Sequence, residues 1–236
     1  LMAACMLLSC SLSKKEAVPK KTALYKKADA PVEARVEDLL SRMTLDEKIG
    51  QMTQIEKGSI HSNDITSLFL GSVLSGGGGS PTNNTPQGWC DMIDGYQKEA
   101  LSTRLGIPIL YGNDSVHGQN NLKGATIFPH NIGLGAANDP LLTEKIASAS
   151  AVETAATGVP WTFAPCLAIA RDPRWGRTYE SFSQDSFIVA SLGSAFVRGW
   201  TKANVGNAAS PVATAKHYLG DGGTEWGSSR MNNYKL

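Results

Sequence analysis

The sequence has few of the residues that bind metals or form disulfides. It holds four cysteines and four histidines in 236 residues. Neither Cys90 nor Cys166 belongs to a Cys-x-x-Cys pair or lies near a histidine at ligand spacing, and the chain has no His-x-His or His-Glu-x-x-His pattern. We therefore expect no metal site and no disulfide framework, and we interpret both cysteines as small residues of the core.

Signatures of nucleic-acid and nucleotide binding are missing as well. The formal net charge is only +1, and the lysine-rich stretch 14–27 is interpreted as a solvated linker, so we expect no nucleic-acid partner. The glycine run GGGGSPTNNTP (76–86) is not followed by Gly-Lys-Ser/Thr, which excludes a phosphate loop. No Gly-x-Gly-x-x-Gly follows a predicted strand, and no Gly-x-Ser-x-Gly elbow occurs. Dinucleotide binding and serine hydrolysis are therefore disfavoured.

The first ten residues, LMAACMLLSC, are typical of an export signal. The apolar run is too short to span a bilayer, and its Leu-Leu-Ser-Cys ending resembles a bacterial lipobox with Cys10 as the lipidated residue. An ordinary export signal is the alternative. The chain begins with leucine and lacks a basic start, so we expect a truncated N-terminus. We assign 1–30 to a lipoprotein-like signal and linker, and expect a periplasmic or outer-membrane bacterial lipoprotein whose one membrane contact is the Cys10 anchor.

Strands and helices are predicted to alternate along the rest of the chain. The predicted strands are almost continuously apolar, which is typical of strands buried on both faces of a parallel sheet. The order favours an α/β fold, either a barrel or a doubly wound sheet. We expect helices at 31–55 (a second one beginning at Thr44), 86–104, 140–158 and 183–202, and strands at 71–75, 107–112, 161–170 and 212–220.

Polar segments follow three of these predicted strands. They are NDSVHG (113–118), RDPRWGR (171–177) and KHYLGDGG (216–223). In a (β/α)8 barrel the carboxyl ends of the strands carry the active site. Only about four strands are predicted here, whereas a closed barrel needs eight and typically ~250 residues. We therefore expect the chain to be a piece of a longer protein.

The segment RDPRWGRTYESF (171–182) concentrates charge next to an apolar run. Such charges are costly to bury unless each has a partner. Arginine's planar guanidinium suits carboxylates, phosphates and paired sugar hydroxyls. Asp114 is suited to accept hydrogen bonds from two neighbouring hydroxyls, and Lys216 and His217 add donors. Residue types alone leave three interpretations open, namely a carbohydrate site, a site for a phosphorylated metabolite, and structural ion pairing.

Three long motifs resemble glycoside hydrolase family 3. They are IPILYGNDSVHGQNNLKGATIFPHNIGLGAANDP, FAPCLAIARDPRWGRTYESFSQD and AKHYLGDGGTEWG, in that order. The resemblance is to the family's N-terminal barrel domain, closest to exported β-glucosidases and exo-glucanases, and runs from about residue 32 to the end. It implies a (β/α)8 TIM-type barrel of which the first half to two-thirds is present, with 31–236 forming the truncated domain.

The resemblance also implies roles for individual residues. In the family, the aspartate of the first motif, the last arginine of Arg-Asp-Pro-Arg-Trp-Gly-Arg and the Lys-His pair bind hydroxyls of the glucosyl ring in subsite −1. In this sequence those residues are Asp114, Arg177, Lys216 and His217. Five further charged residues are expected to hold Arg177 in place, namely Arg171, Asp172, Arg174, Glu180 and Asp221.

The implied activity is hydrolysis of terminal non-reducing β-D-glucosyl residues with retention and release of glucose, without a cofactor. The substrate expected is a β-glucoside or an oligosaccharide. The sequence Gly220-Asp221-Gly222 stands where the family's β-N-acetylglucosaminidases carry a catalytic histidine, which favours the glucosidase branch. A β-xylosidase or an enzyme for another glycone stays open.

One departure from the family pattern bears on catalysis. The family's nucleophile lies in a Ser-Asp-Trp type segment on a later barrel strand, and its acid/base lies on a following domain. No Asp-Trp occurs in this chain. We therefore expect the nucleophile and the acid/base to lie beyond Leu236, in a missing C-terminal part that acts as a partner. The 236-residue chain alone is expected to be inactive, and a non-catalytic sugar-binding fragment is the remaining alternative.

Overall fold

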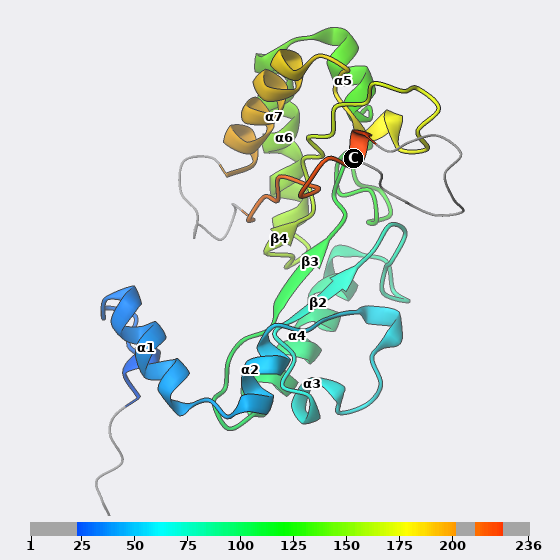
Figure 1. Ribbon diagram of the computed structural model, residues 1–236. Helices are drawn as coiled ribbons and strands as arrows, with labels where there is room; N and C mark the ends of the chain where they lie inside the picture. Colours follow the sequence, from blue (N-terminus) through cyan, green and yellow to red (C-terminus); the bar gives the residue numbers. More distant parts are fainter. Residues whose placement is uncertain (1–22, 202–210, 224–236) are drawn as a thin grey trace, which may run out of the picture. The chain divides into compact units, whose positions relative to one another are not determined.

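The computed structural model describes residues 23–201 and 211–223, and the chain divides into two compact units, 1–43 and 44–236 (Figure 1). Cys10 lies outside the described residues, so its lipidation stays a prediction, as does the domain boundary at residue 30. None of the helices in the described ranges is long and apolar enough to cross a membrane.

In the first unit, helix α1 (Val32–Arg42) packs against the short 3-10 helix η1 (Leu24–Lys26). Asp38 joins the two, because its carboxylate accepts hydrogen bonds from the backbone N–H of Tyr25 at 3.1 Å and from the guanidinium of Arg42 at 2.8 and 3.0 Å. The contact with Arg42 lowers the pKa of Asp38. No residue of α1 is buried, so polar contacts rather than a core hold this unit.

The second unit begins with helix α2 (Leu45–Gln51), which starts at Thr44 as predicted. Thr44 and Glu47 form a capping box, in which Thr44 Oγ1 accepts from Glu47 N–H at 3.2 Å and Glu47 Oε2 accepts from Thr44 N–H at 2.8 Å. Arg104 Nε donates to the same buried carboxylate at 3.1 Å, and its hydrogen bonds lower the pKa of Glu47. Glu47 thus connects the start of α2 to Arg104, which lies just after helix α4 (Pro86–Ser102).

The helix predicted over 31–55 is wrong in its last part. The helix ends at Gln51, and the next residues form strand β1 (Gln54–Glu56), which pairs in parallel with β2 (Ser72–Ser75). Ile55 has helical spacing to the residues before it, but a strand of three residues is too short to show a period of its own. Its pairing partner, distant in the sequence, decides its conformation.

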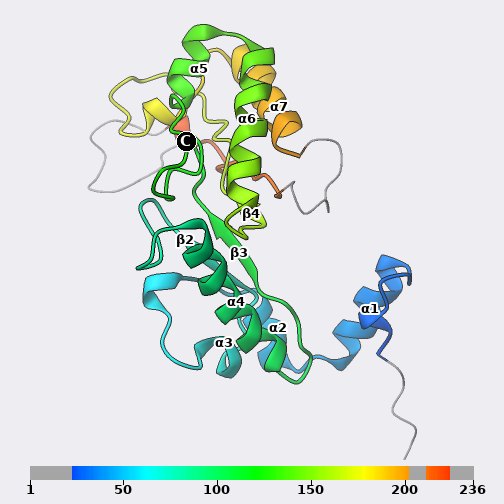
Figure 2. The same ribbon diagram turned by 180° about the vertical axis from the view of Figure 1, so that it is seen from behind.

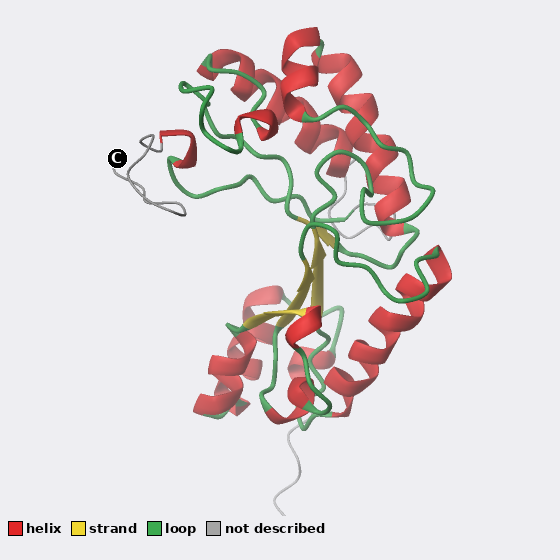
Figure 3. Cartoon of the chain, turned by 90° about the vertical axis from the view of Figure 1, so that its right-hand side faces the viewer, coloured by secondary structure: helices red, strands yellow, loops and turns green. Residues whose placement is uncertain are grey.

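The four strands of the described residues form one parallel sheet in the order β1-β2-β3-β4, completed by β3 (Leu110–Asn113) and β4 (Trp161–Thr162). Figure 3 shows the strands of the sheet in yellow. Each strand pairs with the one that follows it in the sequence, and helices occupy the connections from β2 onward. Parallel strands added in sequential order are the first part of a (β/α)8 barrel. The predicted α/β fold class is confirmed.

Two predicted strands are much shorter than expected. The run 161–170 keeps ladder pairing only in its first two residues, and Pro165 has no N–H with which to extend the ladder. The segment 212–220 forms no strand and makes only isolated bridges, among them the one between Cys166 and Lys216. These bridges still place the carboxyl-terminal segment alongside the run that follows β4.

The helices of this unit build two apolar cores around the sheet. One core gathers side chains of β2, β3, α3 and α4 around Trp89 and Tyr111, which are fully buried. The other lies among α5, α6 and α7 around Leu192 and Trp200, also fully buried. The helices are α3 (Asp64–Ser67), α4 (Pro86–Ser102), α5 (Asn131–Ala137), α6 (Pro140–Ala155) and α7 (Ser186–Thr201), with the 3-10 helices η2 (Lys57–Ser59), η3 (Thr178–Glu180) and η4 (Asp221–Gly223).

Helices α6 and α7 lie side by side, and Gly199 allows their close approach (Figures 1 and 2). Gly199 is buried, and a Cβ atom built on it would lie 2.0 Å from the carbonyl oxygen of Glu144 on α6. Because that neighbour is a backbone atom, a side chain at this position forces the helices apart.

We expect Gly199→Ala to lower the free energy of unfolding by about 1–3 kcal/mol through overpacking. Gly95→Ala on α4 is the matched control, since a Cβ atom there meets nothing within 4 Å, and it should raise stability by about 0.5–1 kcal/mol through helix propensity. Thermal unfolding of both variants measures the difference. Equal midpoints would contradict the close packing of α6 on α7.

Candidate functional site

Four residues predicted to bind sugar lie on three segments that follow strands or bridged segments of the sheet. Asp114 directly follows β3, and Arg177 immediately precedes η3. Lys216 and His217 lie in the segment 211–223, which runs beside the stretch after β4. The predicted clustering at the carboxyl ends of the strands is therefore what the fold produces.

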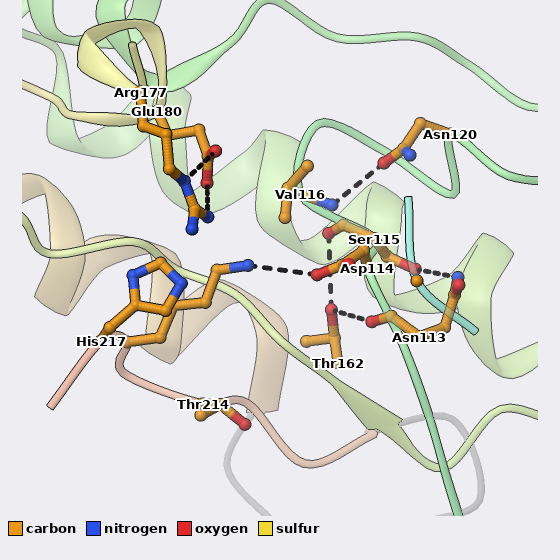
Figure 4. A network of polar contacts seen from close by, with 12 residues as sticks. Asn113, Asp114, Ser115, Val116, Asn120, Thr162, Arg177, Glu180, Thr214 and His217 are labelled. Atoms are coloured by element: carbon orange, nitrogen blue, oxygen red, sulfur yellow. Dashed lines mark hydrogen bonds and ion pairs between the residues drawn. The ribbon is translucent and has the colours of Figure 1, made fainter. Parts of the chain in front are cut away.

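Lys216 and Asp114 form an ion pair across the site. Lys216 Nζ donates to Asp114 Oδ1 at 3.1 Å, and the two side chains are 12% and 26% exposed (Figure 4). Backbone hydrogen bonds fix Lys216 in place, because its N–H donates to the carbonyl of Pro165 at 3.0 Å and its carbonyl accepts from Leu167 N–H at 2.7 Å. The pair joins residues 102 positions apart in the sequence.

A buried network of uncharged polar side chains supports Asp114. Gln119 is 0% exposed, and its Oε1 accepts from Asn113 Nδ2 at 2.6 Å and from Ser115 Oγ at 3.1 Å. Its Nε2 donates to Thr157 Oγ1 at 3.0 Å. Asn113 and Ser115 are the chain neighbours of Asp114, so the network fixes the backbone on both sides of the carboxylate.

Arg177 is held by Glu180 through two parallel hydrogen bonds. Arg177 Nε lies 2.7 Å from Glu180 Oε1, and Nη2 lies 2.7 Å from Oε2. Burial, the largest single influence, raises the pKa of Glu180, but the hydrogen bonds from Arg177 together with the positive charges of Arg177, Lys216 and His217 outweigh it, and the pKa is lowered. The same contact raises the pKa of Arg177. Asn131 Nδ2 also donates to the carbonyl of Glu180 at 2.8 Å, which anchors the pair to α5.

His217 contacts the carboxylate of Asp221, which is almost buried. Nδ1 of the ring lies 2.6 Å from Asp221 Oδ2, with the aspartate side chain 7% exposed and the histidine 34% exposed. A carboxylate on one ring nitrogen fixes the orientation of an imidazole and leaves the other nitrogen for a second partner. Asp221 therefore presents His217 Nε2 to the site.

The other predicted supports of Arg177 are placed differently. Arg174 pairs with Asp172 through Nε–Oδ1 at 2.9 Å and Nη2–Oδ2 at 2.7 Å, and these hydrogen bonds lower the pKa of Asp172 to about 2. Arg171 is exposed and forms no ion pair with a residue that the structure describes. Glu180 is the predicted support that contacts Arg177 directly, and the positioning roles of Arg171, Asp172, Arg174 and Asp221 stay predictions.

A cavity of about 430 Å³ opens beside Lys216, His217 and Asp221. It is lined by 167–169, Arg171 and 215–223, so Lys216, His217 and Asp221 all contribute to its wall. Its volume lies within the range of small-molecule sites. Figure 4 shows the side chains of Asp114, Arg177 and His217 turned toward the same space.

The chemistry of these groups suits hydroxyl recognition. Asp114, Glu180 and Asp221 each hydrogen-bond to a lysine, an arginine or a histidine, so the position of each carboxylate is fixed. Within 23–201 and 211–223, Asp114 Oδ2 accepts no hydrogen bond and Arg177 Nη1 donates none. The site therefore offers Asp114 Oδ2 as an acceptor and Arg177 Nη1 as a donor, beside the further N–H donors of Lys216, to a neutral ligand that has both kinds of group.

Two features of the site were not predicted from the sequence. The first is the buried network around Gln119, for which a polar residue in an otherwise apolar strand, Asn113, was the available signal. The second is the grouping of Cys166 with His217 and Asp221. Cys166 is 2% exposed, as expected of a core residue, and burial raises the pKa of its thiol. Its Sγ nevertheless lies within 4.8 Å of ligand atoms of His217 and Asp221. Cys166 lies on a different segment from His217 and Asp221, so no spacing rule groups the three.

Comparison with known proteins identifies the family. The family model described as the glycosyl hydrolase family 3 N terminal domain matches residues 44–234. This chain belongs to glycosyl hydrolase family 3. The partial barrel and the segments at its strand ends are thus those of the family's N-terminal domain.

Individual relatives of the family agree with this assignment. The chain is 38% identical to a lysosomal beta glucosidase of Dictyostelium discoideum over 78% of this chain, and 32% identical to a periplasmic beta-glucosidase of Salmonella typhimurium over 86%. It covers 25% and 26% of those two proteins, about a quarter of their length. A beta-xylosidase of Formosa agariphila is 28% identical over 82% of this chain and is covered to 22%.

Solved structures are similar in fold as well as in sequence. An exo-1,3/1,4-beta-glucanase from a Pseudoalteromonas species superposes with a TM-score of 0.77 at 42% identity, covering 86% of this chain and 26% of that one. A beta-glucosidase from Listeria innocua in complex with glucose superposes with a TM-score of 0.64 at 32% identity, covering 82% of this chain and 28% of that one.

In Gln119→Leu, the buried donors Asn113 Nδ2 and Ser115 Oγ lose Gln119 Oε1 as their acceptor. We expect each loss to lower the free energy of unfolding by about 1–3 kcal/mol. Gln87→Leu is the matched control, because Gln87 is exposed and its side chain hydrogen-bonds only to Asp91 within the described part of the chain, and its effect should stay within about 0.5 kcal/mol. Denaturant unfolding of the two variants provides the comparison. A Gln119→Leu variant as stable as the Gln87→Leu control would show that the network does not support the site.

Proposed function

We propose that this chain is the sugar-binding part of a longer glycosidase that removes terminal non-reducing β-D-glucosyl residues with retention and releases glucose. The observation that carries the proposal is the buried side of the site, where the ion pair of Lys216 and Asp114 stands beside Arg177 and His217. Membership of glycosyl hydrolase family 3 and the likeness to β-glucosidases and an exo-β-glucanase support it. The whole activity is assigned to the longer protein, because the chain covers about a quarter of these relatives.

The geometry gives each of these residues a role in holding a glucosyl ring. Asp114 uses Oδ1 for Lys216 and keeps Oδ2 as an acceptor for a ring hydroxyl. Lys216 donates one of its three N–H groups to Asp114, and the other two can donate to the sugar. Arg177 keeps Nη1, and His217 keeps Nε2. A polyol satisfies such a set because each hydroxyl both donates and accepts.

These contacts help catalysis if they tighten as the glycosidic bond breaks. The glycosyl ring gains oxocarbenium character in the transition state, its hydroxyls become better donors, and an anionic acceptor then binds them more strongly. Asp114 is such an acceptor, and the network around Gln119 holds it in position before the substrate arrives. In this proposal the chain's residues bind and orient the sugar.

Bond cleavage is assigned to carboxyl groups outside this chain. A retaining glycosidase needs a nucleophile and an acid/base about 5–5.5 Å apart across the scissile bond. The chain has no Asp-Trp, and the carboxylates that the structure places at the site are engaged in binding contacts. The C-terminal part of the longer protein is proposed to supply both groups, with no cofactor.

We assign the longer protein to the bacterial periplasm or outer membrane, tethered by lipid at Cys10. The leader-like residues 1–10 support export, as does the similarity to a periplasmic beta-glucosidase of Salmonella typhimurium. The stretch from there to residue 30 serves as the linker. Metabolic labelling with a radioactive fatty acid tests the anchor, with Cys10→Ser as the variant that should lose the label.

A second candidate activity is β-xylosidase, which the similarity to the Formosa agariphila beta-xylosidase favours. Xylose lacks the hydroxymethyl group of glucose, and a difference of this size in a pocket changes discrimination by about 10–200-fold. The kcat/KM values of the longer protein for p-nitrophenyl β-glucoside and β-xyloside separate the two. The glucoside should be preferred, and a preference for the xyloside would replace the proposed glycone.

We expect Asp114→Asn in the longer protein to lower kcat/KM for p-nitrophenyl β-glucoside by about a hundredfold or more. The amide removes the charge that Lys216 and the ring hydroxyls contact, and such hydrogen bonds contribute several kcal/mol at the transition state. Asp91→Asn is the control, because Asp91 is an exposed carboxylate of α4. If the two variants hydrolyse the glucoside equally fast, Asp114 does not bind the sugar.

We expect the 236-residue chain alone to release no p-nitrophenol from p-nitrophenyl β-glucoside above the buffer rate. The groups that break the bond are proposed to lie elsewhere, so binding without cleavage is the expected result. Hydrolysis that exceeds the rate of an Asp114→Asn chain would mean that a nucleophile is present within residues 1–236. Saturable glucose binding without hydrolysis by this chain would match the alternative of a sugar-binding fragment.

A further inference from the structure

Cys166, His217 and Asp221 bring three metal-ligating side chains together at the edge of the sugar site. Their ligand atoms, a sulfur, a ring nitrogen and a carboxylate oxygen, all lie within 4.8 Å of one another. Cys166 belongs to the run that follows β4, whereas His217 and Asp221 belong to the segment 211–223. The cluster therefore depends on the fold and not on a local sequence motif.

The protein backbone already holds the two halves of this cluster together. Cys166 and Lys216 form a parallel bridge, in which Lys216 N–H donates to the carbonyl of Pro165 and Leu167 N–H donates to the carbonyl of Lys216. Cys166 is 2% exposed and Asp221 is 5% exposed. A site built from such fixed residues loses little conformational entropy when an ion binds.

The ligand set identifies the class of ion. A thiolate, an imidazole and a carboxylate are the three protein ligands typical of Zn²⁺, whereas Ca²⁺ and Mg²⁺ need sets of oxygen ligands. With bonds of about 2.1 Å, tetrahedral ligands stand roughly 3.4 Å apart. His217 Nδ1 and Asp221 Oδ2 lie 2.6 Å apart, so they must separate slightly to bind one ion. Cys166 Sγ lies within 4.8 Å of both atoms, so it must move closer to them by at most about 1 Å.

We infer that Cys166, His217 and Asp221 bind Zn²⁺, and that the ion blocks sugar binding by taking His217. On binding, the thiol loses its proton to solvent, and the proton between His217 Nδ1 and Asp221 Oδ2 passes through solvent to His217 Nε2, so that the neutral ring binds through Nδ1. One thiolate and one carboxylate then balance the two charges of the ion. The fourth position faces the cavity lined by 167–169, Arg171 and 215–223, where water completes the coordination.

The inhibition rests on the proposed sugar-binding role of His217, whereas the metal site itself does not. In the apo site, Asp221 holds the imidazole ring in the orientation that presents Nε2. Coordination turns both side chains toward Cys166, so the ring leaves that orientation. Zn²⁺ and sugar should therefore compete, and a rise in KM with an unchanged kcat is the expected pattern.

Co²⁺ absorption tests the metal site without any use of activity. Co²⁺ is the probe because its thiolate complexes absorb in the near ultraviolet, which reports the sulfur ligand directly. The background for every sample is the longer protein with Cys5→Ser and Cys10→Ser. This protein and its Cys90→Ser variant should show the band, while Cys166→Ser and Cys166→Ala should not. Cys90 is the matched control, since its Sγ hydrogen-bonds only to the carbonyl of Ala156 among the described residues.

Zn²⁺ inhibition of p-nitrophenyl β-glucoside hydrolysis by the same proteins tests the consequence. Loss of an outer partner of a metal ligand already costs about tenfold to a hundredfold in affinity, so loss of Cys166 should raise the inhibitory Zn²⁺ concentration by at least about tenfold. Activity without zinc should be unchanged in Cys166→Ser and in Cys90→Ser.

The outcomes separate the metal site from the proposed function. A cobalt band that is absent from the background protein, or that persists in both Cys166 variants, would overturn the site. Equal Zn²⁺ inhibition of Cys166→Ser and the background protein would overturn the blocking role. A Cys166-dependent band in a protein that hydrolyses no glycoside would keep the metal site and reject the proposed function instead.

Discussion

The ion pair between Lys216 and Asp114 is the contact on which the geometry of the site depends. It joins the end of β3 to the segment 211–223, 102 residues later, and both side chains are largely removed from water. A charge in such a place is costly unless its partner is fixed opposite it. Here the partner is fixed on both sides, by the bridge at Lys216 and by the network of Asn113, Ser115 and Gln119 around Asp114.

The same requirement explains the charged segment that follows the apolar run 161–170. Two of its three arginines are neutralised locally, Arg174 by Asp172 and Arg177 by Glu180, so the cost of placing these two next to a core is offset within a few residues. The two ion pairs differ in exposure, and only the less exposed pair lies at the proposed sugar site. Arg174 is 61% exposed, whereas Arg177 is 37% exposed and shares the site with His217.

The sequence allowed the fold class and the segments that carry the proposed sugar-binding residues to be predicted, because both follow from patterns local in the chain. Apolar runs marked buried parallel strands, and the motifs that resemble the family carried Asp114 and Arg177. Strand β1 was missed because three residues show no period, and the run 161–170 was overestimated because apolar character does not reveal where pairing stops at Pro165. The grouping of Cys166 with His217 and Asp221 is a property of the folded chain alone.

The central claim is that four residues hold a glucosyl ring, namely Asp114, Arg177, Lys216 and His217. A crystal structure of the longer protein with bound glucose tests this claim most directly. The account predicts glucose hydroxyls within hydrogen-bond distance of Asp114 Oδ2 and Arg177 Nη1, with the ion pair of Lys216 and Asp114 intact. Glucose bound elsewhere, with Asp114 and Arg177 still facing solvent, would contradict the account.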